Sequence, residues 1–146
     1  MPIVSMVRPR WSDMDPFGHV NHANVVTLLE EARVPLLFDG ALRAGLTELP
    51  KGIVVVRLAV RYRAPIVLAH EDVRVEITLR ELKFASFTLD YRVHGGPSET
   101  DRLAVTAETV LAPYDVEQQR PRRLTEAERE FLAKQLDWQE PGDKSD

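Results

Sequence analysis

The clearest pattern of hydrophobic positions lies in the N-terminal third of the chain. From Ala23 onward apolar residues recur every three or four positions, at Val25, Leu28, Leu29, Ala32, Leu36 and Leu37. That spacing predicts a helix with one buried face. The polar residues assigned to its other face are Asn24, Thr27, Glu30, Glu31 and Arg33. Asn21 or His22 stands at the N-cap, and Pro35 is expected to bend or end the helix.

After Gly52 the apolar period changes to two, which predicts strands with one buried face. In residues 53–63 the predicted buried face is unbroken and consists of Val54, Val56, Leu58, Val60 and Tyr62. Further strands are predicted over residues 73–80, 86–93 and 103–112, and a short one over 3–8. Because the links between consecutive strands are short, the sheet is expected to be antiparallel.

The C-terminal region contains a helix signal and a tail. Thr125 and Glu128 have the spacing of a capping box ahead of an apolar stripe, which predicts a terminal helix. The 146 residues fit one domain, expected over 1–138, and residues 139–146 are expected to be a flexible tail. The fold class is therefore α+β, with an antiparallel sheet of about five strands, one long helix and an extra C-terminal helix.

The composition and charge of the chain limit the kinds of binding partner that we expect. The chain has 19 Lys and Arg residues and 23 Asp and Glu residues, which gives a net charge of −4. It therefore has no overall positive field that would attract nucleic acid. There is no Cys, which removes thiolate chemistry and disulfides and favours a cytoplasmic location. No apolar run approaches the roughly 18 residues of a membrane span, and the N-terminus lacks a signal-peptide pattern. We expect neither a nucleic acid nor a membrane as partner.

The loop that leads into the long helix holds the densest group of chemically active residue types. They are Asp13, Asp15, Gly18, His19, Asn21 and His22. A helix N-terminus offers unpaired amides and the positive end of the dipole, so a carboxylate beside it suits hydrolysis. Asp and Asn also commonly cap turns and helices, and the pattern alone leaves both interpretations open.

Metal sites fit this loop poorly. Asp13, Asp15 and Gly18 imitate the start of a calcium-binding loop, but Phe17 and Asn24 stand where ligands are needed. His19 and His22 are three residues apart within a loop, which is not a known two-ligand spacing for zinc. We expect no metal and no cofactor.

The loop and helix also resemble a known signature, that of the 4-hydroxybenzoyl-CoA thioesterase-like branch of the hotdog-fold superfamily. The matching residues are Arg10, Ser12, Asp13, Asp15, Gly18, His19, Val20, Asn21 and Ala23, then Glu30, Glu31, Ala32 and Arg33. The resemblance covers residues 3–113 and implies a hotdog fold and an acyl-CoA thioesterase. It assigns Asp15 as nucleophile or general base, and the backbone amide of His22 as the group that polarises the thioester carbonyl. Because another hotdog thioesterase branch uses an acid on the helix, the resemblance also makes Glu31 the second-choice catalytic carboxylate.

Two departures from the family pattern concern the substrate. His22 stands where relatives often have Asn, and Val25 where they often have Tyr, so the acyl pocket near Val25 is expected to differ. Gly18, His19 and Asn21 are assigned to substrate binding with Val25. Lys83 is the cation that matches the family's basic cluster for the nucleotide phosphates. The arginines that could substitute for that cluster are Arg57, Arg61, Arg63 and Arg80.

The resemblance also implies an oligomeric partner, and it defines the alternative functions to be considered. The partner is a second copy of the chain, in a homodimer or homotetramer with the site at the subunit boundary. The main alternative function is a non-catalytic module of the same fold that binds acyl-CoA or acyl-carrier protein. A dehydratase or hydratase would need a His and an acid facing each other across the dimer, and the sequence offers no pair for those positions.

Overall fold

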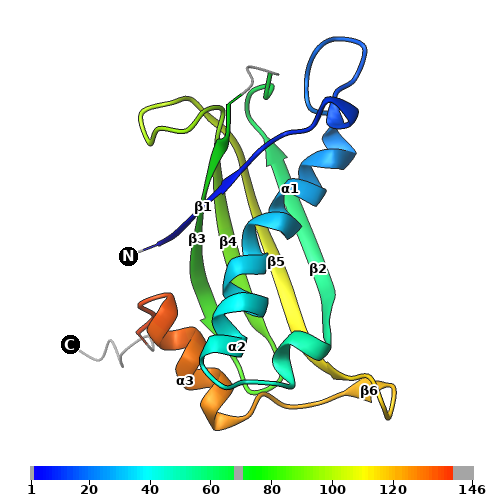
Figure 1. Cartoon of the computed structure of the whole chain (residues 1–146), viewed down its shortest axis with the longest axis vertical. Helices are drawn as coiled ribbons and strands as arrows, with labels where there is room; N and C mark the ends of the chain where they lie inside the picture. The colour runs from blue at the N-terminus through cyan, green and yellow to red at the C-terminus, as the bar shows by residue number, and fades with distance from the viewer. Residues whose placement is uncertain (1, 68–70, 140–146) are drawn as a thin grey trace, which may run out of the picture.

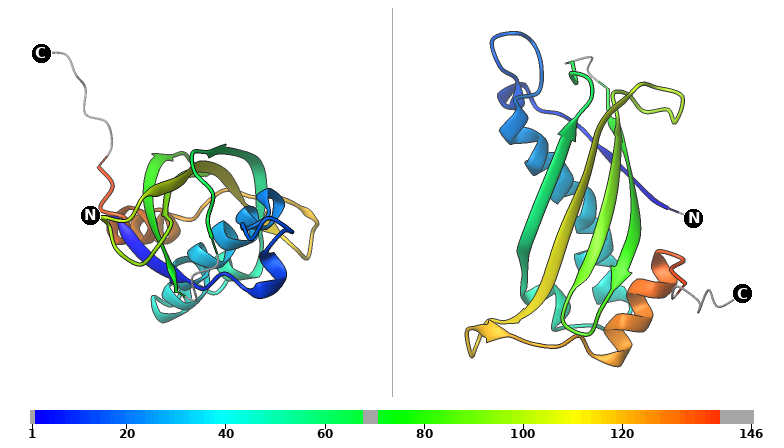
Figure 2. Two further views of the ribbon diagram at one scale, coloured as in Figure 1. Left: turned by 90° about the horizontal axis from the view of Figure 1, so that it is seen from above. Right: turned by 180° about the vertical axis from the view of Figure 1, so that it is seen from behind.

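The computed structural model describes residues 2–67 and 71–139, and its centre is one curled antiparallel sheet. The sheet order is β1-β3-β4-β5-β2, with β6 paired to β5. The strands are Ile3–Val7 (β1), Ile53–Tyr62 (β2), Val73–Leu82 (β3), Phe87–His94 (β4), Leu103–Asp115 (β5) and Arg120–Pro121 (β6). The sheet wraps around α1 (His22–Val34), and α3 (Glu126–Gln135) lies at one end (Figures 1 and 2). The predicted α+β hotdog fold is confirmed.

The long helix begins where the sequence predicts. Asn21 is its N-cap, and its side-chain Oδ1 accepts a hydrogen bond from the Ala23 amide at 3.0 Å. The predicted stripe is buried against the sheet. α1 ends at Val34, but Pro35 keeps a helical φ of −58°, so the chain continues through a π-helical segment, Pro35–Gly40, into α2, Ala41–Arg43.

The assignment of Arg33 to the polar face is wrong. Arg33 is only 9% exposed, and its Nη1 lies 3.4 Å from the Tyr91 hydroxyl beneath the helix. The reason is geometric, because Arg33 is four residues after buried Leu29 and therefore shares its side of the helix.

The predicted buried face of β2 is also wrong in two respects. A bulge between Val55 and Arg57 places Val54 and Leu58 on opposite faces, so the apolar face is not unbroken. Moreover, Val56 is 63% exposed, and Leu58 and Tyr62 are exposed too. The physical reason is that β2 is an edge strand, whereas α1 packs against β1 and β3.

The remaining elements follow the predicted pattern. The inward residues of β3 and β4 are buried, and β5 runs three residues further than predicted, to Asp115. The capping box of α3 is formed by Thr125 and Glu128. The predicted tail falls outside the described residues from 140 onward. Among the described helices, none has the length and apolarity needed to cross a membrane.

Candidate active site

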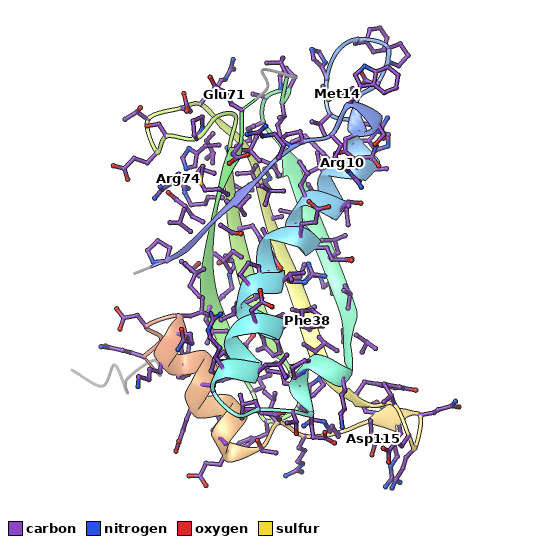
Figure 3. The ribbon with its side chains drawn as sticks, viewed as in Figure 1. Arg10, Met14, Phe38, Glu71, Arg74 and Asp115 are labelled. Atoms are coloured by element: carbon purple, nitrogen blue, oxygen red, sulfur yellow. The ribbon has the colours of Figure 1, made fainter. Side chains whose placement is uncertain are left out.

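The loop between Met14 and Val20 is a closed turn at one end of the sheet. Met14 and Val20 form an antiparallel bridge, the Asp15 amide donates to the His19 carbonyl at 2.8 Å, and the Gly18 amide donates to the Asp15 carbonyl at 3.1 Å. Gly18 has a φ of +77°, a conformation that favours glycine. Figure 3 shows Met14 and Arg10 at this end of the molecule and Asp115 at the other. The turn fixes the backbone of Asp15.

One oxygen of the Asp15 carboxylate accepts hydrogen bonds from the loop backbone, and the other is available to a ligand. Its Oδ1 accepts hydrogen bonds from the amides of Phe17, at 2.9 Å, and His19, at 3.2 Å. Its Oδ2 accepts no hydrogen bond from residues 2–67 or 71–139. Turn capping and chemistry are therefore compatible at Asp15, because they use different oxygens.

Asp13, the other aspartate of the pair, is wholly committed to structure. It is 1% exposed, its Oδ2 accepts from the Arg10 amide at 2.7 Å, and its Oδ1 accepts from Arg10 Nη2 at 3.0 Å. Burial acts to raise the pKa of Asp13, but the hydrogen bonds from Arg10 outweigh it and hold that pKa below its usual value. The Asp13 carbonyl also accepts from the Asn21 amide at 2.8 Å, which links the loop to the helix start.

The first turn of α1 leaves one amide available. The Asn21 carbonyl accepts from the amides of Asn24 and Val25, and the Asn21 side chain takes the Ala23 amide. The His22 amide finds no acceptor in the part of the chain that the structure describes. An unpaired amide at a helix N-terminus is a ready site for negative charge.

Tyr62 is a site residue that the sequence analysis missed. Its hydroxyl donates to the His22 carbonyl at 2.6 Å, and the two rings meet edge to face at 6.4 Å. Burial raises the pKa of Tyr62, so the hydroxyl stays a neutral donor. Only the position of the C-terminal end of β2 beside the helix start reveals this contact, and no sequence motif marks it.

A hollow of about 380 Å³ brings the predicted residues together. Asp15, His19, His22 and Val25 line it, with Tyr62 and Arg63 on the opposite wall. Gly18 lines a neighbouring hollow of about 460 Å³ that also reaches Asp15. The Asn21 side chain is occupied by the helix cap. Within the described chain, no three His, Asp or Glu side chains are grouped as a metal site.

Two predicted residues do not reach this hollow within one chain. Lys83 follows the far end of β3, where its Nζ lies 3.5 Å from Glu81 Oε1. Glu31 is exposed on α1 and acts electrostatically on Arg10, and it is not part of the wall that contains Asp15.

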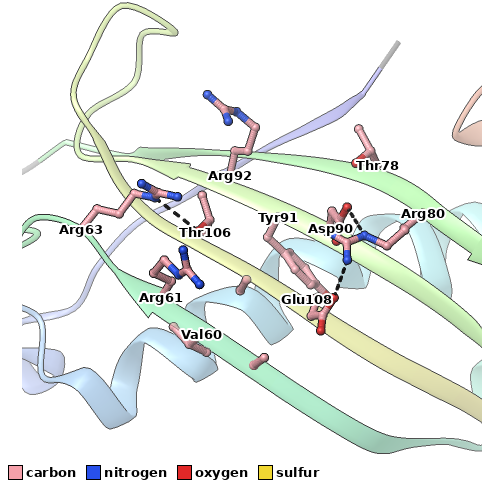
Figure 4. A pocket seen from close by; sticks show the side chains of 12 residues that line it. Val60, Arg61, Arg63, Thr78, Arg80, Asp90, Tyr91, Arg92, Thr106 and Glu108 are labelled. Carbon is pink, nitrogen blue, oxygen red and sulfur yellow. Dashed lines mark hydrogen bonds and ion pairs between the residues drawn. The ribbon is translucent and has the colours of Figure 1, made fainter.

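The four candidate arginines divide into paired and unpaired groups, and Figure 4 shows three of them, Arg61, Arg63 and Arg80. Arg80 forms ion pairs with Asp90 at 2.8 Å and Glu108 at 2.9 Å, and Arg57 lies 3.4 Å from Glu108. In the described ranges, Arg61 and Arg63 form no ion pair, although Arg63 donates to the Thr106 hydroxyl at 3.4 Å. Arg63 lines both the Asp15 hollow and a hollow of about 520 Å³ on the sheet. Unneutralised positive charge therefore adjoins the Asp15 hollow.

The fold and the loop together define a hotdog-fold thioesterase, and comparison with known proteins agrees. The model of the thioesterase-like superfamily matches residues 9–136, and the chain belongs to that superfamily. It is a thioester hydrolase by this membership. A search of curated proteins returned no match.

Three solved structures illustrate the similarity. A thioesterase from Thermus thermophilus, complexed with coenzyme A and Zn, is 28% identical, with a TM-score of 0.74 over 93% of this chain and 95% of that one. The PA2801 protein of Pseudomonas aeruginosa is 25% identical, with a TM-score of 0.73 over 91% and 100%. A 1,4-dihydroxy-2-naphthoyl-CoA thioesterase from Synechocystis, 16% identical with a TM-score of 0.73 over 95% and 100%, supports the fold alone.

Proposed function

We propose that this protein is an acyl-CoA thioesterase in which Asp15 is the nucleophile or general base and the His22 amide polarises the thioester carbonyl. One observation carries the proposal: an available carboxylate oxygen and an available helix N-terminal amide belong to residues that line the same hollow. The 28% identical Thermus relative, which was solved with coenzyme A, supports CoA as the carrier.

The chemistry follows from where charge develops. Attack on the thioester carbon puts negative charge on the carbonyl oxygen, and a fixed amide donor there is worth about 3 kcal/mol. Asp15 Oδ2 either attacks the carbon, giving an anhydride that water then cleaves, or removes a proton from an attacking water. Both routes break the carbon–sulfur bond and release a free acid and the thiol of CoA. Anchoring of Oδ1 by the Phe17 and His19 amides keeps the carboxylate in one orientation.

Arg61 and Arg63 are the proposed contacts for the phosphates of CoA. Both lie at the end of β2 or just after it, and Arg63 belongs to the wall shared by the catalytic hollow and the sheet hollow. Guanidinium groups without a carboxylate partner are free to bind phosphate oxygens, whereas Arg57 and Arg80 are neutralised. Lys83 is the proposed contact only if a partner subunit brings it near.

A homodimer through β2 is the proposed assembly. The edge strand exposes Val54, Val55, Val56 and Leu58, and an exposed apolar edge is a surface that proteins usually cover. Pairing of two β2 strands would place a partner beside the catalytic hollow, since Tyr62 ends β2. We expect Val56→Lys to dissociate the assembly in sedimentation, whereas Val4→Lys on the opposite edge strand leaves it intact. A dimer that pairs again through another face would give the homotetramer.

The Asp15→Asn variant tests the catalytic assignment. We expect kcat for acyl-CoA hydrolysis to fall by about 10²- to 10⁴-fold with little change in thermal unfolding, because Oδ1 keeps its two amide donors. Asp13→Asn is the matched control, and we expect it to lose folding stability because the buried Asp13 carboxylate accepts hydrogen bonds from the backbone and side chain of Arg10. Equal rates in wild type and Asp15→Asn would remove Asp15 from its role.

The alternative is a binding module without turnover. Its supporting observation is that Asp15 already has a complete structural duty through Oδ1. Tight binding of acyl-CoA by the wild type, without release of thiol from any ester, would establish that alternative.

A further inference from the structure

Arg33 is a buried cation without a buried counter-ion. It is 9% exposed, and its hydrogen-bonding neighbour is the Tyr91 hydroxyl at 3.4 Å, which in turn lies 2.8 Å from Thr109 Oγ1. Within residues 2–67 and 71–139, no Asp or Glu forms an ion pair with Arg33. An unpaired charge removed from water is unfavourable, so this position calls for an explanation.

The groups packed around Arg33 do not neutralise it. Burial raises the pKa of the Tyr91 hydroxyl, which therefore stays neutral despite the nearby cation. Glu30, three residues earlier on α1, lines the same cavity but is exposed and makes no ion pair with Arg33 in the described chain. The missing negative charge must therefore come from outside these residues.

Arg33 lines a cavity of about 530 Å³ between the C-terminal half of α1 and β2. The cavity walls are mainly apolar, and they include Val34, Leu37, Phe38, Ile53, Val55 and Leu111. Figure 3 shows Phe38 on the helical segment well away from Met14 and the catalytic loop. The exposed Glu30 and Lys51 also line the cavity, and Lys51 pairs with Glu48 at 2.9 Å, so Arg33 is the buried charge within these mainly apolar walls. A buried cation in such walls fits a ligand that has a long apolar part and one anionic end.

A row of apolar β2 residues lies between this cavity and the Asp15 hollow and defines an apolar path along the strand. Leu58, Val60 and Tyr62 pair with Thr109, Ala107 and Val105, so they share the inner face of the sheet that faces α1. Tyr62 lines the Asp15 hollow, and Val55 at the other end lines the Arg33 cavity. Arg33 comes eleven positions after His22 in α1, which corresponds to about 16 Å along the helix axis.

Building on the proposed function, we infer that the acyl chain lies along this path and that Arg33 binds a carboxylate at its distal end. The preferred substrates are then CoA thioesters of long-chain dicarboxylic acids. With the thioester carbonyl at the His22 amide, an extended chain of this length brings its far carboxylate to the guanidinium, and the Tyr91 hydroxyl is the second polar group there. Arg33 is thus a specificity-determining residue that contacts substrate.

Paired substrates test the inference. We expect the wild type to have a kcat/KM for dodecanedioyl-CoA about 10- to 100-fold above that for lauroyl-CoA, the size of a charge-assisted contact. Adipoyl-CoA and hexanoyl-CoA are too short to reach Arg33, so their ratio is expected to be near one. Arg33→Met should bring the long-chain ratio to about one, and Arg33→Lys should retain part of it. Arg43→Met, at an exposed arginine of α2, is the matched control.

Stability separates recognition from a structural role. Replacing an unpaired buried charge by an apolar side chain of similar length is often neutral or stabilising, so Arg33→Met should unfold at or above the wild-type temperature. A destabilised Arg33→Met that slows both long-chain substrates equally would overturn the inference. So would a wild type with equal kcat/KM for dodecanedioyl-CoA and lauroyl-CoA.

Binding measurements keep the inference testable without turnover. Calorimetry with the non-hydrolysable thioethers of CoA that correspond to the two long chains should show the same preference and its loss in Arg33→Met. If no CoA ester is hydrolysed, the proposed function fails, while these thioethers still decide the role of Arg33. Laurate that binds more tightly to wild type than to Arg33→Met, with no preference between the thioethers, would assign the Arg33 site to free fatty acid and overturn the substrate inference.

Discussion

Helices α1 and α3 begin in opposite ways. At α3 the Thr125 hydroxyl accepts from the Glu128 amide at 3.1 Å, and Glu128 Oε1 accepts from the Thr125 amide at 2.8 Å. Arg122 adds two contacts to the same carboxylate, at 2.7 and 2.8 Å. At α1, Asn21 caps a single amide with its side chain, and the His22 amide stays available beside Asp15.

The comparison shows which of these two helix N-termini leaves polar groups without a hydrogen-bond partner. At α3 the reciprocal bonds satisfy the cap, and Glu128 is 2% exposed, so that helix end contributes to stability. At α1 an amide and a carboxylate oxygen remain open on a hollow. These two groups can therefore meet a ligand in the hollow, whereas the corresponding groups at α3 are occupied by the cap.

The largest expected effect on stability comes from breaking the α3 cap. Glu128→Ala removes the partner of Arg122 and leaves a half-buried cation behind, so we expect a loss of about 3–5 kcal/mol in the free energy of unfolding. Urea denaturation measures this loss. Glu126→Ala, an exposed residue of the same first turn, is the control and should change the free energy of unfolding by less than about 0.5 kcal/mol. If Glu128→Ala lowers the free energy of unfolding by much less than about 3 kcal/mol, the Arg122–Glu128 ion pair contributes little to the stability of the start of α3.

The same cap should make stability depend on pH. Burial acts to raise the pKa of Glu128, but the bonds from Arg122 and Thr125 outweigh it, so the folded pKa lies below the ordinary 4.5. The folded state therefore binds fewer protons, and the stabilisation is fully present above pH 4.5 and is lost as the pH falls through the folded value. Denaturation at a series of acid pH values should show a smaller loss in Glu128→Gln than in wild type. If the free energy of unfolding falls equally with pH in wild type and Glu128→Gln, Glu128 is not the group responsible for the acid dependence.

A smaller effect distinguishes the two caps directly. Asn21→Ala and Thr125→Ala each remove a side-chain cap, so each should lower the free energy of unfolding by about 1 kcal/mol. Only Asn21→Ala should also lower kcat, because the peptide bond between Asn21 and His22 carries the His22 amide, the proposed carbonyl-polarising group, at the Asp15 hollow. Parallel denaturation and thioesterase assays measure both quantities. An equal loss of kcat in Thr125→Ala would mean that activity simply follows stability.

These two helix ends also show what the sequence could predict. The α3 cap is a local motif, Thr125 and Glu128 three residues apart, and its prediction is confirmed because all partners are neighbours in the chain. The start of α1 is equally readable at Asn21. Tyr62 could not be found, because its contact with His22 spans 40 residues and depends on the position of β2.

The two errors of the sequence prediction, in β2 and at Arg33, have different origins. The bulge in β2 shifts its register against β5, and a period-two pattern carries no mark of one extra residue. The spacing of four residues from Leu29 places Arg33 on the buried side of α1, but its contact there, the Tyr91 hydroxyl, is 58 residues away in the chain and leaves no mark in the helix sequence. The catalytic roles of Asp15 and His22 stay predictions until turnover is measured.

The smallest expected effect belongs to Tyr62, a positioning residue that holds the carbonyl of His22. Tyr62→Phe keeps the ring contact but removes the 2.6 Å hydrogen bond, which is partly exposed and worth about 0.5 kcal/mol. If that contact restrains the residue whose amide faces the thioester, kcat should fall about two- to threefold while KM stays unchanged. Tyr114→Phe, at the far end of β5, serves as the matched control when the substrate is hexanoyl-CoA, because this chain is too short to reach the Arg33 cavity that Tyr114 lines. A change in KM alone would instead make Tyr62 a wall of the substrate pocket, and the open end of α1 would then be positioned by Asn21 without help from β2.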